Sequence, residues 1–180
     1  MSTKQILLSG FGGQGILFAG KMLAYKGMME DKNVSWLPSY GPEMRGGTAS
    51  CSVIVSDTPV GSPIVSHPDV LIAMNLPSLD KYEDAVVSGG TIYVDSTLIE
   101  RKVKRTDVKA IYIPATKLAS DNGTPTLANM IIMGKVLSEE GQFENEEGIM
   151  AALKKVISAK RADMLDVNMN VMRLGHEYAE

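Results

Sequence analysis

A glycine-rich segment near the beginning of the sequence has the composition of an anion-binding loop. Residues 10–15 read Gly-Phe-Gly-Gly-Gln-Gly, which fits the pattern G-x-G-x-x-G. Glycines permit a tight turn and a close approach of the backbone to a ligand, and a helix that begins after such a turn offers unpaired N–H groups to a phosphate. We therefore predict an anion site here, with a tight turn that binds no ligand as the alternative.

A dinucleotide site requires one further residue, which this sequence lacks at the expected place. Such sites carry an acidic side chain about 20 residues beyond the glycines, at the end of the second strand, for the ribose hydroxyls. The second predicted strand ends here in Pro38-Ser39-Tyr40, whereas Glu30 and Asp31 come before it. The pattern therefore favours an anion site over a dinucleotide site.

A second segment carries one arginine among residues that break regular structure. Residues 39–48 read Ser-Tyr-Gly-Pro-Glu-Met-Arg-Gly-Gly-Thr. Arg45, between a proline turn and the pair Gly46-Gly47, could present its guanidinium to a phosphate or a carboxylate. Because the segment follows a strand, we expect it at the same carboxyl edge of the sheet as the glycine loop. The alternative is a surface turn in which Arg45 pairs with Glu43.

A third segment, residues 122–130, combines residues that start helices with an asparagine. Thr124 or Thr126 suits an N-cap position, and Pro125 suits the first turn. Asn129 then falls near the first turn of the helix. Local composition favours a structural role for these residues, with polar contacts to a ligand at the same edge as the alternative.

The remaining reactive side chains do not form a catalytic or metal-binding set. Cys51 is the only cysteine, so the chain can form neither an internal disulfide nor a four-thiolate cluster, and we expect a small buried hydrophobe. His67 and His176 lie far apart in the sequence, and Asp95 is expected to cap the turn after its strand. We therefore predict no catalytic residue and no metal site, and any redox chemistry must come from a bound cofactor or another chain.

Short apolar runs and helical periodicity predict the elements that position these segments. Strands are expected at residues 5–9, 34–37, 48–55, 70–74, 91–95 and 110–113. Helices are expected at residues 16–29, within 75–87, and at 126–140, 145–157 and 161–178. Residues 57–68, with three prolines, are expected to form an excursion or a hairpin.

The order of these elements predicts an α/β fold. Strands alternate with helices, and most strands are apolar throughout, which is typical of a mostly parallel sheet with helices on both faces. The sequence contains no internal repeat and no linker, and 180 residues suit one core. We therefore predict a single three-layer domain over residues 1–180.

The overall composition excludes several classes of protein. The chain is 44% hydrophobic and 22% charged, with a formal net charge of -3, which excludes intrinsic disorder and a nucleic-acid binder that neutralises phosphates. The apolar run Ile6-Leu7-Leu8 is too short for a signal peptide, and no run reaches the roughly 18 apolar residues of a membrane span, so we expect a cytoplasmic protein. We interpret the 12 methionines as core residues, with contact surfaces for other proteins as the alternative.

Three segments together resemble the gamma subunit of the 2-oxoacid:ferredoxin oxidoreductases. They are Gly10–Ile16, Pro38–Ala49 and Leu127–Met130, and the resemblance covers nearly the whole chain. The form Pro-Glu-Met-Arg-Gly-Gly-Thr, followed by Gly61-Ser62-Pro63, is more similar to the 2-oxoglutarate and branched-chain 2-oxoacid (ketoisovalerate) enzymes than to the pyruvate enzymes.

The resemblance implies a Rossmann-like domain within an assembled oxidoreductase. Such enzymes convert a 2-oxoacid and coenzyme A to acyl-CoA and CO2, and they reduce ferredoxin, the external electron acceptor. The implied partners are alpha- and beta-type subunits, which hold thiamine diphosphate between them, and a ferredoxin-like delta subunit; iron–sulfur clusters lie in such partner chains. The gamma chain is expected to be inactive alone and to help form the coenzyme A site.

The resemblance also assigns site residues. It places the coenzyme A phosphates at the glycine loop and at the arginine segment, and it adds an asparagine from the third motif; the residues are Gly12, Gly13, Gln14, Gly15, Arg45, Gly46, Gly47 and Asn129. Two other functions stay open from the residues alone. One is a stand-alone nucleotide-binding protein or small dehydrogenase, and the other is a purely structural subunit whose glycine loop turns tightly at an interface.

Overall fold

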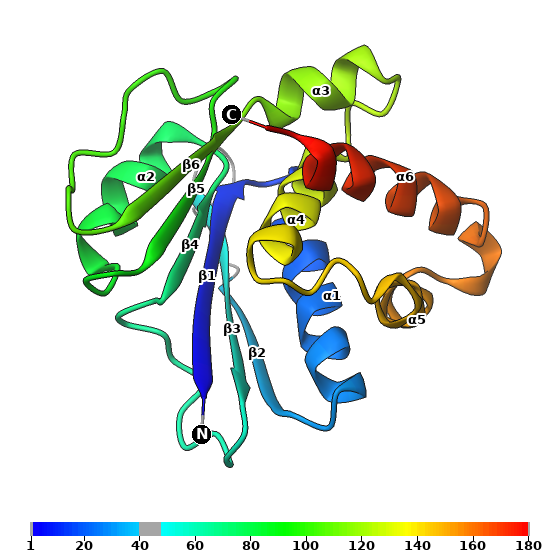
Figure 1. The fold of residues 1–180 in the computed structure, drawn as a ribbon, viewed down its shortest axis with the longest axis horizontal. Coiled ribbons are helices and arrows are strands. Elements are labelled where there is room, and N and C mark those ends of the chain that lie inside the picture. The colour runs from blue at the N-terminus through cyan, green and yellow to red at the C-terminus, as the bar shows by residue number, and fades with distance from the viewer. Residues whose placement is uncertain (1, 40–47, 180) are drawn as a thin grey trace.

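A six-stranded sheet forms the centre of the molecule in the computed structural model, which describes residues 2–39 and 48–179 (Figure 1). The strands are β1 (Thr3–Phe11), β2 (Asn33–Ser39), β3 (Thr48–Ser56), β4 (Val70–Ala73), β5 (Thr91–Asp95) and β6 (Lys109–Ile113). Their order across the sheet is β2-β3-β1-β4-β5-β6. All six predicted strands are therefore present, and β1 comes to lie in the interior of the sheet.

The strand directions confirm a mostly parallel sheet. β1 pairs in parallel with β4, β4 with β5, and β5 with β6, whereas β3 is antiparallel to both of its neighbours, β1 and β2. β2 consequently runs in the same direction as β1, and β3 is the only described strand that opposes the others. Because β3 pairs Thr48 with Phe11, its beginning lies beside the end of β1.

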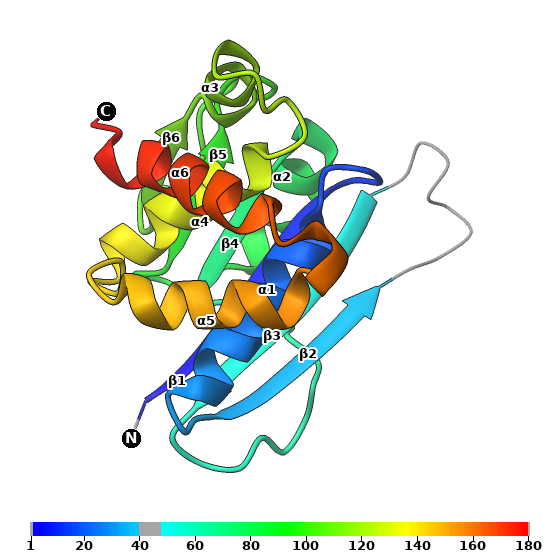
Figure 2. The same ribbon diagram turned by 90° about the vertical axis from the view of Figure 1, so that its right-hand side faces the viewer.

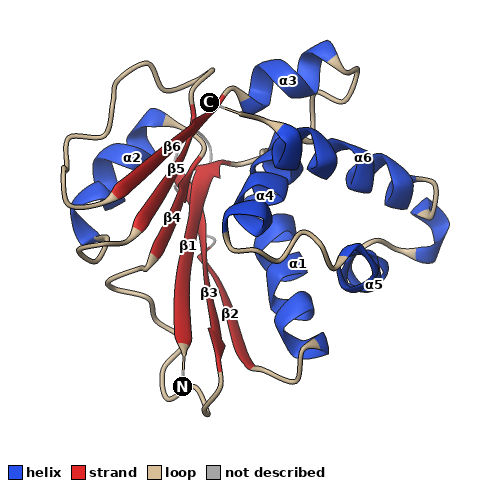
Figure 3. Cartoon of the chain, in the orientation of Figure 1, coloured by secondary structure: helices blue, strands red, loops and turns tan. Residues whose placement is uncertain are grey.

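Helices lie on both faces of the sheet, and one face carries more of them than the other (Figure 3). One face carries α1 (Ile16–Met29) and α4 (Ala128–Glu139), and the other carries α2 (Leu76–Tyr82). Figure 2 shows α5 (Glu146–Val156) and α6 (Met164–Glu177) packed outside α1 and α4, while the short α3 (Ala115–Asp121) follows β6. None of the helices in the described part of the chain combines the length and apolar character needed to cross a bilayer.

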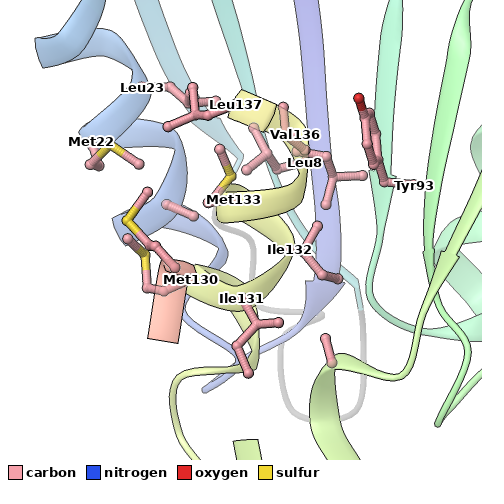
Figure 4. Packing of buried hydrophobic residues seen from close by; sticks show 14 of the residues in the cluster. Leu8, Met22, Leu23, Tyr93, Met130, Ile131, Ile132, Met133, Val136 and Leu137 are labelled. Atoms are coloured by element: carbon pink, nitrogen blue, oxygen red, sulfur yellow. The ribbon is translucent and has the colours of Figure 1, made fainter. Parts of the chain in front are cut away.

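The main hydrophobic core lies around α4, which is buried on nearly all sides. Ile132 and Val136 lie toward the sheet, whereas Leu137 lies toward Leu23 of α1 (Figure 4). Six methionines are almost completely buried, as the interpretation of the methionines as core residues predicts; they are Met22, Met74, Met130, Met133, Met169 and Met172. An apolar helix between the sheet and an outer pair of helices can bury many side chains with few aromatics, because thioethers fill irregular gaps.

The helix boundaries differ from prediction mainly in the third segment. α4 begins at Ala128, and its N-cap is Leu127, so the prediction of a threonine cap is wrong. The reason is that Thr124 closes the turn after α3: its carbonyl accepts from the N–H of Leu127 at 2.9 Å and its hydroxyl donates to the carbonyl of Ala119. The segment 57–68 contains no strand and is therefore an excursion and not a hairpin.

Candidate functional site

The glycine loop connects the end of β1 to the beginning of α1, as predicted. Gly13 and Gly15 have φ angles of 91° and 71°, a left-handed conformation that glycine adopts without steric cost. Gly15 is the N-cap of α1 and provides no side-chain hydrogen bond, so the first N–H groups of this helix have no side-chain cap. With Gly12 and Gly13 exposed, the loop presents backbone donors and a helix N-terminus to a ligand.

Gln14 fixes the shape of this loop. Its Oε1 accepts from the backbone N–H of Phe11 at 2.6 Å, and its Nε2 donates to the carbonyl of Met74 at 3.0 Å. Both ends of the amide are thus engaged within the chain. The side chain holds the loop between β1 and β4, so the loop's own contacts to a ligand are those of its backbone.

Asn129 reaches the glycine loop from the beginning of α4. Its side chain is 3% exposed, and its Nδ2 donates to the carbonyl of Gly15 at 3.0 Å. A Cβ at residue 15 would lie 2.4 Å from that Nδ2, so this contact requires glycine at position 15. The structure therefore brings the first and third predicted segments together.

A cavity of about 280 Å³ opens beside this contact. It lies where α1, α4 and α6 begin and α5 ends, and Figure 2 shows the beginning of α1 close to the segment between α5 and α6. Its described lining combines apolar and polar side chains with one cation, Arg161, and contains no acidic residue. The lining residues are Gly15, Phe18, Thr126, Leu127, Asn129, Val156, Ile157, Ser158, Arg161, Met164 and Asn168. Helix N-termini carry partial positive charge, and the first turns of α1 and α4 contain no acidic residue, whereas α6 has Asp163 as its N-cap and Asp166 in its first turn. The N-termini of α1 and α4 together with Arg161 therefore favour an anionic ligand.

Sequence reasoning missed two polar residues of this cavity, Arg161 and Asn168. Asn168 is 2% exposed and lies on the buried side of α6, with Met164 before it and Met172 after it. A polar side chain within an otherwise apolar helical stripe is the signal that could have found it. Arg161, in an exposed 3-10 turn, gives no such signal.

Three predicted site residues, Arg45, Gly46 and Gly47, lie outside the described residues. The strands on either side of their segment are described: β2 ends at Ser39 and β3 begins at Thr48, which pairs with Phe11 directly before the glycine loop. The chain therefore leaves and re-enters the sheet at the carboxyl edge of β1. The placement of the arginine segment at this edge stays a prediction.

The other singled-out residues have structural roles or lie in loops. Asp95 is completely buried, and its carboxylate accepts from the N–H of Thr97 at 3.1 Å and from the hydroxyl of Thr116 at 2.5 Å, as the capping interpretation predicts. His67 is an exposed loop residue. Within residues 2–39 and 48–179, no cluster of three or more His, Cys, Asp or Glu side chains could hold a metal ion.

A larger cavity, about 340 Å³, lies at the opposite, amino edge of the sheet and is not part of this site. It is lined by three lysines, and each of them pairs with a carboxylate: Lys4 with Glu140, Lys26 with Glu30 and Lys32 with Asp57. The Nζ of the buried Lys26 also donates to Gln142 at 3.0 Å. Each of these lysines has a carboxylate partner within the chain, so the described lining of this larger cavity offers no unpaired cation to an anionic ligand.

Cys51 is expected to be unreactive in the folded protein. It lies buried in β3, and burial raises the pKa of its thiol from 9.0 to about 12, so the neutral thiol predominates near pH 8. A colorimetric thiol reagent should label less than a tenth of the native protein at pH 8 over minutes and label it fully in guanidinium chloride. The folded thiol binds its proton more tightly than the unfolded thiol, so Cys51 should also lower stability as the pH rises from 9 toward 12. Rapid labelling of native protein would contradict the buried assignment.

Comparison with known proteins gives consistent matches. The family model described as pyruvate ferredoxin/flavodoxin oxidoreductase matches residues 5–178. Ketoisovalerate oxidoreductase subunit VorA of Methanothermobacter thermautotrophicus is 39% identical over 175 residues, which are 97% of this chain but only 36% of that relative's length. 2-Oxoglutarate synthase subunit KorC of Methanocaldococcus jannaschii is 40% identical over 134 residues, with 73% of this chain and 72% of the relative covered. Both names belong to the two enzyme types that the sequence motifs favour.

Solved structures share the fold. The gamma subunit of a keto/oxoacid ferredoxin oxidoreductase from Geobacter sulfurreducens is similar with a TM-score of 0.80 and 27% identity, over 97% of this chain and 96% of that one. A 2-oxoglutarate:ferredoxin oxidoreductase from Magnetococcus marinus, solved with 2-oxoglutarate, coenzyme A and succinyl-CoA bound, has a TM-score of 0.85 at 22% identity, over 97% of this chain and 30% of that one, a likeness of fold alone. The chain therefore belongs to the pyruvate ferredoxin/flavodoxin oxidoreductase family and is of the gamma-subunit type of the 2-oxoacid:ferredoxin oxidoreductases.

Proposed function

We propose that this chain is the gamma component of a 2-oxoacid:ferredoxin oxidoreductase and that it holds coenzyme A there. The observation that carries the proposal is the cavity beside Gly15, where helix α1 begins without a side-chain cap and where Arg161 is the one charged residue of the described lining. Coenzyme A is an anion with a pyrophosphate and a 3′-phosphate, and backbone N–H groups and arginine are the donors that such groups need. These residue types fit coenzyme A.

The proposed task of the chain is positioning. The cavity beside the glycine loop has no carboxylate, histidine or thiol among its described lining residues, so those residues include no general acid or base that could activate the hydroxyls of Thr126 and Ser158. When bound, coenzyme A supplies the thiol that accepts the acyl group of the decarboxylated 2-oxoacid. The glycine loop and its neighbours would hold the phosphate end of that molecule and so orient the thiol toward a partner's active site, which is an effect of proximity.

We propose that the redox centres of the complex lie in partner chains. One cysteine, Cys51, cannot ligate an iron–sulfur cluster, and it is buried within the sheet. We infer that alpha- and beta-type subunits hold thiamine diphosphate, that a ferredoxin-like subunit or ferredoxin receives the electrons, and that residues 1–180 act as one domain of a cytoplasmic complex. Ketoisovalerate or 2-oxoglutarate is the proposed 2-oxoacid, because the relatives named for these substrates are 39–40% identical to this chain.

Replacing Arg45 tests the proposal in the assembled complex. Arg45→Ala should raise the KM for coenzyme A about 10- to 100-fold, because a hydrogen bond to a charged group contributes roughly 1.5–3 kcal/mol. The rate of 2-oxoacid-dependent CO2 release without coenzyme A should stay within twofold of wild type. Steady-state kinetics at varied coenzyme A and single-turnover CO2 release measure the two quantities.

The control is Lys104→Ala, which removes an exposed cation on the link before β6. It should leave both quantities unchanged. Equal loss of coenzyme A affinity and decarboxylation in Arg45→Ala would contradict the assignment. An unchanged KM for coenzyme A would favour the purely structural role instead.

A further inference from the structure

The larger cavity, at the amino edge of the sheet, combines an aliphatic floor with a charged rim. Five of the six charged side chains in its three ion pairs are 27–42% exposed, so they lie where the cavity meets solvent. The aliphatic lining is mostly buried and consists of Ile6, Leu23, Val55, Val70, Val136 and Leu137. The volume of about 340 Å³ falls at the lower end of the range for small-molecule sites, so the cavity suits a small metabolite.

The balance of charge in the rim decides which class of ligand it takes. Three lysines and three carboxylates leave the described lining without net charge. A ligand of one sign would gain at one member of an ion pair and lose at the other, whereas a zwitterion offers each member a counterion. The aliphatic floor requires an apolar body as well. The ligand must therefore be a small zwitterion with an aliphatic side chain.

Two of the three ion pairs are fixed by additional hydrogen bonds. Nζ of the buried Lys26 donates to Gln142 at 3.0 Å in addition to its carboxylate partner. The carboxylate of Asp57 accepts from the backbone N–H of Ser2 at 2.7 Å in addition to its lysine partner. A ligand that separated either pair would have to replace several contacts at once, so these two pairs are expected to stay closed.

Lys4 and Glu140 form the pair that a ligand can open most easily. Nζ of Lys4 lies 2.8 Å from Oε2 of Glu140, and neither side chain makes a further hydrogen bond within residues 2–39 and 48–179. Exposed ion pairs contribute little to stability, so separating this one costs little. Apolar surface adjoins both charges: Ile6 follows Lys4 on the same face of β1, and Leu137 precedes Glu140 by one helical turn.

We propose that this cavity binds a neutral α-amino acid with an aliphatic side chain. The carboxylate of the amino acid pairs with Lys4, its ammonium group pairs with Glu140, and its side chain packs on Ile6 and Leu137. One exposed ion pair is thereby replaced by two, and apolar surface of the ligand is removed from water. The site lies where α1 and α4 end, whereas the cavity beside Gly15 lies where they begin, so the proposal does not depend on the coenzyme A role.

Titration of the full chain with L-leucine tests the site, and two analogues each remove one charge from the ligand. 4-Methylpentanoate has the same carbon skeleton without the ammonium group, and 3-methylbutylamine lacks the carboxylate. Each should bind about 10-fold more weakly than L-leucine, because one charge-assisted contact is lost. Isothermal titration calorimetry measures the affinities, and methyl NMR locates the ligand by shifts of the Ile6 and Leu137 methyl groups.

Two variants assign the two charged contacts separately. Lys4→Met should weaken L-leucine binding about 10-fold and abolish its advantage over 3-methylbutylamine, and Glu140→Gln should abolish its advantage over 4-methylpentanoate. Lys109→Met is the matched control, because Lys109 pairs with Glu139 at 2.7 Å but neither residue lines the cavity. It should leave the affinity for L-leucine unchanged.

Three results would overturn the proposal. The first is the absence of both binding heat and methyl shifts at millimolar L-leucine. The second is equal affinity for L-leucine and either analogue, which would mean that the cavity does not recognise a zwitterion. The third is a set of shifts at Leu127 and Val156 in place of Ile6 and Leu137, which would put the ligand in the cavity beside Gly15. None of these results bears on the coenzyme A role, which Arg45→Ala tests separately.

Discussion

Replacing Gly134 with alanine is expected to destabilise the folded chain by about 2–3 kcal/mol, the cost of inserting an atom where neighbouring groups cannot move aside. Gly134 lies in α4 where α6 crosses it, and a Cβ there would lie 1.9 Å from the carbonyl oxygen of Met172. The contact is reciprocal, since a Cβ at Gly175 of α6 would lie 1.8 Å from the carbonyl oxygen of Ile131. Both obstacles are backbone atoms, so the helices would have to move apart by roughly 1 Å and lose packing along their length.

The sign of this effect is informative, because helix propensity predicts the opposite. Alanine stabilises a helix interior by about 1 kcal/mol relative to glycine, so an uncrowded position would gain stability. Thermal or urea unfolding of Gly134→Ala should instead show a midpoint lowered by roughly 5–10 °C or its urea equivalent. Gly61→Ala, at an exposed loop position with no atom near the added Cβ, should be close to neutral. A stabilised Gly134→Ala would contradict the close crossing of α4 and α6.

The elements that position the site could be predicted because their signals are local. The run before the glycine loop is apolar and β-forming, and the helix after it, Ile16–Met29, begins and ends where periodicity places it. The order and direction of the strands in the sheet are harder to predict from the sequence. β3 enters the sheet antiparallel, between β1 and β2, and a rule based on alternating elements does not reveal that reversal.

The cavity could not be predicted, because it is formed by tertiary contacts alone. Its polar residues come from α4 and the turn before it and from α6 and the segment before it, and no sequence spacing joins Asn129 to Asn168. The local interpretation of residues 122–130 as a helix start was right about Asn129 being near the start of α4. It was wrong about the cap, because Thr124 closes the turn after α3 and Leu127 is the N-cap. It also could not reveal that Asn129 donates to the carbonyl of Gly15, 114 residues away.

Gly15→Ala is expected to lower the free energy of unfolding by about 2–3 kcal/mol, from two separate causes. An alanine with φ near 71° is strained by roughly 1–2 kcal/mol. Its Cβ would also displace the buried amide of Asn129, and the hydrogen bond from Nδ2 to the carbonyl of Gly15 would be lost at a cost of about 1 kcal/mol. Chemical denaturation of the isolated chain measures the sum.

A double-mutant cycle separates the two causes and tests whether Asn129 and the glycine loop act as one unit. Gly13→Ala is the matched control, because Gly13 has a φ of 91° but no atom within 4 Å of an added Cβ, so it carries the strain without the contact. In combination with Asn129→Ala, Gly15→Ala should cost about 1 kcal/mol less than the two single changes added together, whereas Gly13→Ala should be additive. Additivity in both cycles would mean that Asn129 does not support the loop, and the link between the third motif and the anion site would then be lost.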